Sequence, residues 1–163
     1  MASGPVLICY DGSDPAEAAL ATVAALLPRA QVLVVVVWKP IREAILAVSL
    51  GPAPPISDAA DVDERQRRAA EQFAKDGARR ATEAGLQAKP LTLKAEGAVW
   101  EGIAELADER DAQLIVCGAS RAGVKSALLD TVPTALIHRA SRPVLVAPSA
   151  RASAARRRDL KEK

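Results

Sequence analysis

The sequence predicts an α/β fold: a doubly wound, Rossmann-like sheet of five parallel strands with helices on both faces. Apolar runs of about four to eight residues recur along the chain and end near glycine or proline, as buried parallel strands do. Segments with helical spacing separate these runs, and such alternation gives a parallel sheet with right-handed crossovers. Half of the 163 residues are hydrophobic but only 2% are aromatic, so the core is built from aliphatic side chains. That composition suits this fold better than a nucleic-acid module that stacks bases on aromatic rings.

Five segments are predicted as strands. The second is the clearest, because its unbroken valines indicate burial on both faces. The fourth is a short apolar run that stops at Gly118. The predicted strands span residues 5–10, 31–38, 90–95, 113–117 and 143–147.

Four segments between the strands are predicted as helices. Before the first, Ser13 or Asp14 is a candidate N-cap, and Pro15 suits the first turn. The second is long, charged and amphipathic, with Gly85 as its stop. The third carries an apolar stripe formed by Val99, Ile103 and Leu106. The predicted helices span residues 16–27, 61–84, 98–110 and 132–140.

Residues 1–148 are predicted to form one domain, and residues 149–163 a basic, disordered tail. The last thirteen residues carry six bases and two acids, a net charge of +4. The formal net charge of the whole chain is +2, so the other 150 residues carry a net charge of −2. No basic face for nucleic acid is therefore expected on the folded body. Residues 39–60 contain prolines and a glycine that break any long element, although residues 43–48 could form a short helix, and we expect a surface excursion.

Cysteine content and hydropathy predict a cytoplasmic protein without a membrane span. The chain has two cysteines and no segment typical of a secretory leader, which indicates a reducing compartment. No apolar run approaches the roughly 18 residues that a membrane helix needs. One histidine and two distant cysteines do not form a zinc cluster of the usual spacing, so no metal site is expected.

Two loops at the ends of predicted strands are candidate parts of one binding site. The first begins D-G-S at Asp11, and the second follows Gly118. In a doubly wound sheet both lie at the carboxyl edge, where ligands bind at the switch point in strand order. The second loop reads G-A-S-R-A-G-V-K-S, close to a P-loop, but Val124 separates Gly123 from Lys125 and the loop follows the fourth strand, so a true P-loop is not predicted.

Three stretches in the same order resemble the universal stress protein family over about residues 5–147. They are VLICYDGS, EGAVWEGIAELADERDAQLIVCG and GVKSALLDTVPTALIHRASRPVLV. The resemblance implies a five-stranded parallel sheet in the order 3-2-1-4-5. It also implies a homodimer through the last strand, residues 143–147, and a cytoplasmic stress-response or regulatory module. Many family members bind ATP through G-x-x-G, nine residues, then G-[ST].

The resemblance implies a nucleotide site in which part of the glycine motif is altered. Asp11 matches the ribose- and adenine-side aspartate, and the backbone of Val37 matches the position that meets the base. Ser120 or Arg121 stands where the second motif glycine belongs, and Asp130 where the third belongs. The implied nucleotide-binding residues are Asp11, Val37, Gly118, Ser120, Arg121, Gly123, Asp130, Thr131 and Val132.

Asp130 predicts weakened phosphate contacts. At about 5 Å and an effective dielectric near 20, a carboxylate and a phosphate charge repel by about 3 kcal/mol before screening. Arg121 could offset part of this repulsion, and Mg²⁺ held by Asp130 could reverse it. Two structural alternatives to a ligand-binding role stay open. Asp130 could cap the helix that begins near Val132, and Asp11 could form an Asx turn.

The sequence thus leaves two leading functions. The first is binding of an adenine nucleotide (ATP, ADP or AMP, with or without Mg²⁺), and the second is a nucleotide-free dimeric interaction or structural protein. ATP hydrolysis is the least supported, because no residue set supplies a general base and a metal site. Cys9 and Cys117, at the ends of neighbouring strands, are expected to be buried structural thiols.

Overall fold

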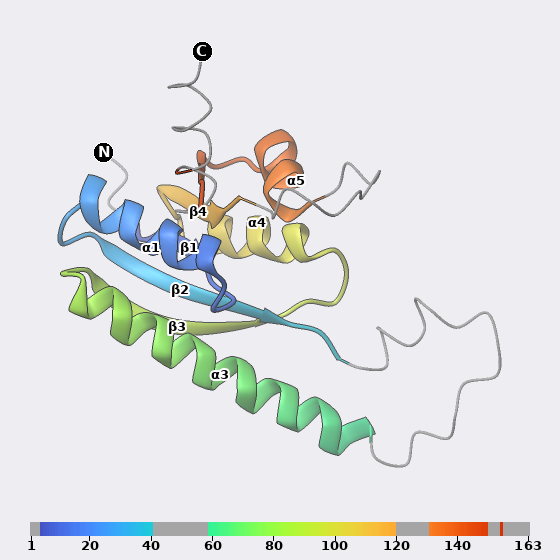
Figure 1. The fold of residues 1–163 in the computed structure, drawn as a ribbon. Coiled ribbons are helices and arrows are strands. Elements are labelled where there is room, and N and C mark those ends of the chain that lie inside the picture. The colour runs from blue at the N-terminus through green and yellow to red at the C-terminus, as the bar shows by residue number, and fades with distance from the viewer. Residues whose placement is uncertain (1–3, 41–58, 120–130, 150–153, 155–163) are drawn as a thin grey trace.

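The computed structural model describes residues 4–40, 59–119, 131–149 and 154, and within them it confirms the predicted α/β sheet (Figure 1). All strand pairs are parallel, and the strand order is β3-β2-β1-β4-β5. The strands are β1 (Val6–Cys9), β2 (Gln31–Trp38), β3 (Gln87–Lys94), β4 (Leu114–Gly118) and β5 (Val144–Ala147). The helices are α1 (Asp14–Leu26), α3 (Ala59–Glu83), α4 (Val99–Glu109) and α5 (Val132–Arg139).

The helices cover both faces of the sheet. On one face, small side chains of α1 and α3, such as Ala19 and Ala74, pack on Ile8 and Val34. On the other face, α4 and α5 pack on the alternate strand residues, with Ile103 buried beside Leu7 and Val35. Figure 1 shows α3 running along β2 and β3. The unbroken apolar strands follow from this arrangement, because the central strands have no solvent-facing side.

The predicted element boundaries hold to within a few residues, with one larger shift at β3. We predicted this strand over 90–95, whereas it begins at Gln87 and ends at Lys94. Its first residues are polar or small and still pair with β2, since Gln87 lies opposite Gln31. Backbone pairing at an edge strand needs no apolar side chain, and an edge tolerates a proline such as Pro90.

Hydrogen bonds connect the residues just before β5 to the end of α4. The guanidinium of Arg142 donates from Nε to Asp108 Oδ1 and from Nη1 to Asp111 Oδ1, each at 2.7 Å. Ser141 Oγ also donates to Asp108 Oδ1, at 2.6 Å. These bonds position β5 at the edge of the sheet, where β4 is its partner strand.

Several sequence predictions lie outside the described residues: the excursion and short helix within 41–58, the loop 120–130, and nearly all of the tail from 150 onward. None of the helices in the described ranges is both long and apolar enough to cross a membrane.

Candidate functional site

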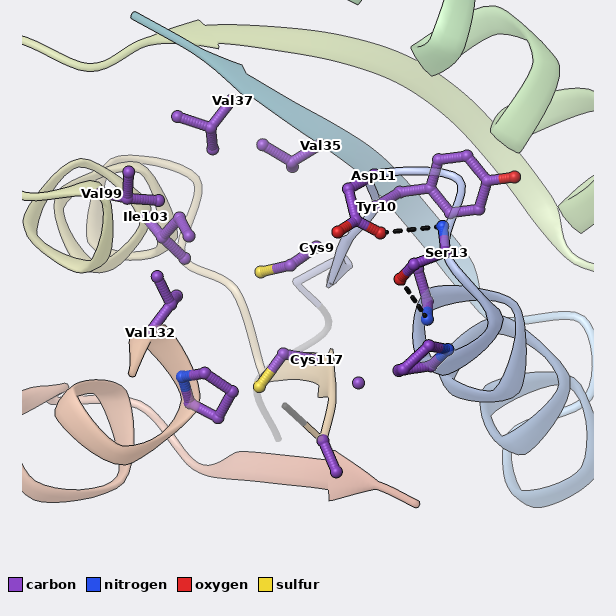
Figure 2. Close-up of a pocket in the computed structure, with 15 residues that line it drawn as sticks. Cys9, Tyr10, Asp11, Ser13, Val35, Val37, Val99, Ile103, Cys117 and Val132 are labelled. Carbon is purple, nitrogen blue, oxygen red and sulfur yellow. Dashed lines mark hydrogen bonds between the residues drawn. The ribbon is translucent and has the colours of Figure 1, made fainter. Parts of the chain in front are cut away.

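A cavity of about 520 Å³ lies at the carboxyl edge of the sheet, around the ends of β1 and β4 (Figure 2). These two strands are neighbours, and their connections leave in opposite directions: through α1 to β2, and through α5 to β5. This is the switch point at which ligands of doubly wound sheets bind. Its volume falls in the range of about 300–1,000 Å³ typical of small-molecule sites. The cavity is lined by Cys9, Tyr10, Asp11, Ser13, Pro15, Ala16, Val35, Val37, Val99, Ile103, Cys117, Gly118, Ala119, Val132 and Pro133.

Asp11 leaves the end of β1 and forms an Asx turn. Its Oδ1 accepts a hydrogen bond from the backbone N–H of Ser13 at 2.9 Å, so the Asx-turn hypothesis is confirmed. The next residue in this turn is left-handed, a conformation that Gly12 adopts at no steric cost, with φ of +75°. Asp11 is exposed and lines the cavity, and its Oδ2 accepts no hydrogen bond from the described residues. The turn therefore holds the carboxylate at the cavity with one oxygen available to a ligand.

The helix that follows this turn begins as the sequence predicts. Ser13 is the N-cap of α1, and its Oγ accepts from the backbone N–H of Ala16 at 3.4 Å. Tyr10 packs on the face of the sheet that α1 covers, and its hydroxyl donates to Glu17 Oε1 of that helix at 2.5 Å. Burial, together with this hydrogen bond, raises the pKa of Tyr10 to about 12. The Tyr10 hydroxyl thus stays protonated at neutral pH and keeps its bond to α1.

Gly118 ends β4 at a point of close packing. A Cβ placed on it would lie 2.4 Å from the backbone C and O of Pro15, in the first turn of α1. No real side chain fits at that distance, so the glycine is required by the approach of β4 to α1. The sequence marked Gly118 as a ligand glycine, and the structure adds a packing reason for it.

The start of α5 forms the far side of the cavity. Val132 and Pro133 line it, whereas Thr131 does not belong to the lining. Thr131 occupies the N-cap position without a side-chain capping bond, and its hydroxyl lies 2.9 Å from that of Thr134. The N-cap of α5 is therefore Thr131, and Asp130, the alternative cap that the sequence left open, lies outside the described residues.

The structure brings together Asp11, Val37, Gly118 and Val132 around one cavity. The predicted residues Ser120, Arg121, Gly123 and Asp130 lie outside the described residues. Two residues that line the cavity, Val99 and Ile103, were not predicted as site residues. The sequence analysis placed both on the apolar stripe of a helix. Helical periodicity does not show that the first turns of such a stripe face a cavity and not the core. Cys9 and Cys117 were expected to be structural thiols, and both line the cavity.

The described lining contains no lysine, arginine or histidine. Its titratable side chains are the two thiols, Tyr10 and Asp11. Across the described ranges, no three His, Cys, Asp or Glu side chains gather as metal ligands. The arrangement therefore suits binding of a small polar molecule with an apolar part, and it presents no catalytic base–nucleophile pair in these residues.

Comparisons with known proteins agree with this geometry. The family model described as "Universal stress protein family" matches residues 3–148. None of the curated proteins matches the chain. Among solved structures, a universal stress family protein from Burkholderia pseudomallei is similar at 24% identity and a TM-score of 0.69, covering 90% of this chain and 97% of its own.

Two further similar structures are complexes with a nucleotide. The universal stress protein from Archaeoglobus fulgidus in complex with dAMP has 20% identity and a TM-score of 0.54, covering 90% of this chain and 99% of its own. A universal stress family protein from Arabidopsis thaliana with AMP bound has 12% identity and a TM-score of 0.56, covering 90% of this chain and 92% of its own. At these identities the likeness shows the fold.

Proposed function

The chain belongs to the universal stress protein family, and on that premise we propose that it binds an adenine nucleotide in the cavity at the carboxyl edge of its sheet. The observation that carries the proposal is the position of Asp11, whose carboxylate is held by its Asx turn at the rim of an otherwise largely apolar cavity. We propose that the protein acts through this site as a cytoplasmic regulatory module of the stress response.

The two ends of the cavity match the two ends of a nucleoside. Val37, Val99 and Ile103 form an apolar wall that suits the faces of an adenine ring. The Asp11 carboxylate suits the ribose hydroxyls, because an ionised carboxylate oxygen accepts hydrogen bonds from O–H donors. The nucleoside would then lie between the end of β1 and the wall formed by β2 and α4.

The phosphate end would lie near Gly118 and the start of α5. The N–H groups in the first turn of a helix favour an anion, and α5 begins at the cavity, where its N-cap Thr131 makes no side-chain capping bond. Asp130, which stands where the family motif has a glycine, would bring a like charge near a triphosphate. We therefore propose that AMP competes well with ATP, in line with the dAMP and AMP complexes of the similar structures. The family resemblance suggests ATP with Mg²⁺ as an alternative ligand of the same site.

Asp11→Ala should weaken adenosine, AMP, ADP and ATP by the same factor, about tenfold or more. The variant loses a charge-assisted hydrogen bond worth about 1.5–3 kcal/mol to the nucleoside, and 1.4 kcal/mol corresponds to one decade in Kd. Titration calorimetry with each of the four ligands, with and without Mg²⁺, measures the factor.

Asp11→Asn is the matched control, because an asparagine oxygen can still accept from the Ser13 N–H and keep the turn. We expect affinities between those of the parent and Asp11→Ala. Equal affinities in all three proteins would mean that Asp11 serves the turn alone. If the parent binds none of the four ligands, the nucleotide proposal fails.

A second function, an interaction module that works as a dimer, is favoured by one observation. β5 is an edge strand, and its side chains Val144, Leu145 and Val146 are partly exposed. Such an edge is a template for pairing with another chain. We propose that two copies of the chain pair through β5, whether or not a nucleotide is bound.

A further inference from the structure

Cys9 and Cys117 are the two cysteines of the chain, and they lie near the carboxyl ends of the neighbouring strands β1 and β4. β1 and β4 pair in parallel with Ile8 opposite Val116, so the next residue along each strand is a cysteine. Adjacent strands are about 4.8 Å apart, and disulfides form between Cα atoms about 4.4–6.8 Å apart. The backbone spacing of this pair therefore permits a disulfide.

The two thiols also share one face of the sheet. Leu7 and Ile115 precede them by two residues on their strands, and both pack in the core beneath α4 and α5. Alternation along a strand places Cys9 and Cys117 on that same face. Figure 2 shows both sulfur atoms in the cavity, and both cysteines are free thiols. Both thiols thus open onto the same cavity, and Cys117 Sγ, which lies 3.9 Å from Leu145 O on β5, is on the same face as Cys9.

We infer that Cys9 and Cys117 form a redox-active dithiol at the floor of the cavity, which hydrogen peroxide converts into an intramolecular disulfide. One thiolate attacks a peroxide oxygen; the O–O bond breaks, and a sulfenic acid and water result. The second thiol attacks the sulfenic sulfur, an S–S bond forms, and a second water leaves. Two electrons pass from the sulfurs to the peroxide, and the two thiol protons leave in the water.

The surroundings of the pair set the rate of this reaction. Burial raises the pKa of Cys117 to about 11, and burial with the nearby Cys117 and Asp11 raises the pKa of Cys9 further. No described lysine, arginine or histidine lines the cavity to oppose this. The thiolate is the reacting form, so oxidation should be slow at pH 7. As long as the pH stays well below the two pKa values, the rate should rise about tenfold for each pH unit.

Peroxide treatment of the full chain tests the inference. After denaturation, intact-mass spectrometry of the monomer fraction should show the loss of two hydrogen atoms, and thiol titration should fall from two groups to none. A reductant should restore both. Because the chain has no other cysteine, an intramolecular disulfide can only join Cys9 to Cys117.

Cys9→Ala and Cys117→Ala are matched controls, each leaving one thiol that can form no intramolecular bond. Both should gain oxygen atoms or link between chains without losing two hydrogens. The inference is overturned if the parent keeps two thiols at pH 9 under excess peroxide, forms disulfides only between chains, or gains oxygen alone. The result is read on the parent without ligand, so it does not depend on nucleotide binding. Added AMP should slow the reaction only if nucleotide also occupies the cavity.

Discussion

Gly118→Ala is expected to destabilise the protein by about 3 kcal/mol, at the upper end of the usual cost of overpacking. The added Cβ would lie 2.4 Å from backbone atoms of Pro15 and 2.5 Å from its Cβ. These atoms belong to the first turn of α1 and cannot rotate away, so the end of β4 and α1 must separate. For a chain of this length the melting temperature should fall by about 6–12 °C. Thermal unfolding followed by circular dichroism measures the change.

Gly97→Ala is the matched control. A Cβ there would meet only the flexible carboxylate of Glu101, at 3.3 Å, and its φ is not left-handed. We expect a change within about 0.5 kcal/mol of the parent, as for ordinary surface substitutions. If Gly118→Ala melts like Gly97→Ala but loses nucleotide, the glycine serves ligand binding alone, and the packing argument is wrong.

The strands and helices could be predicted because local patterns specify them. The run QVLVVVVW gave β2 with its observed bounds, and Ser13 and Gly85 marked the start of α1 and the end of α3. The strand order came from the resemblance rather than from periodicity, and it is confirmed. The start of β3 was missed, because its first residues are held by backbone pairing with β2 and carry no apolar signal.

The site was predictable only in part, because a cavity is a tertiary feature. Asp11 and Gly118 stand out in sequence as the residues just after apolar runs, and both reach the cavity. The wall formed by Ile103 depends on how α4 lies over the sheet, and the contact of Gly118 with Pro15 depends on the packing of α1 against β4. Cys9 and Cys117 were expected at the ends of neighbouring strands, whereas the register of β1 against β4 is a tertiary feature that the sequence does not reveal.

The backbone of β5 indicates how its open edge can be blocked without breaking the sheet. Pro143 O accepts from Ile115 N and Ala147 O accepts from Ala119 N, so the odd-numbered residues of β5 bond to β4. By alternation, the N–H and C=O of Val146 point to the open edge. The Val146 side chain, in contrast, packs against the core under α4 and α5. A lysine at Val146 would thus place a charge against the core, whereas a proline keeps an apolar side chain there and removes an outward N–H.

Val146→Pro is therefore expected to convert a β5-paired dimer into a folded monomer. The proline ring replaces the N–H that a partner strand would use, and it restricts Leu145 to the extended conformation that the strand already has. Val146→Ala is the matched control, since it trims the side chain but keeps the N–H, and it should remain dimeric. Light scattering coupled to gel filtration gives the mass, and circular dichroism confirms that each variant is folded. A parent that is monomeric at every concentration, or a Val146→Pro variant that stays dimeric, would refute pairing through β5. A dimeric parent that binds no adenine nucleotide would leave the interaction module as the function that the chain supports.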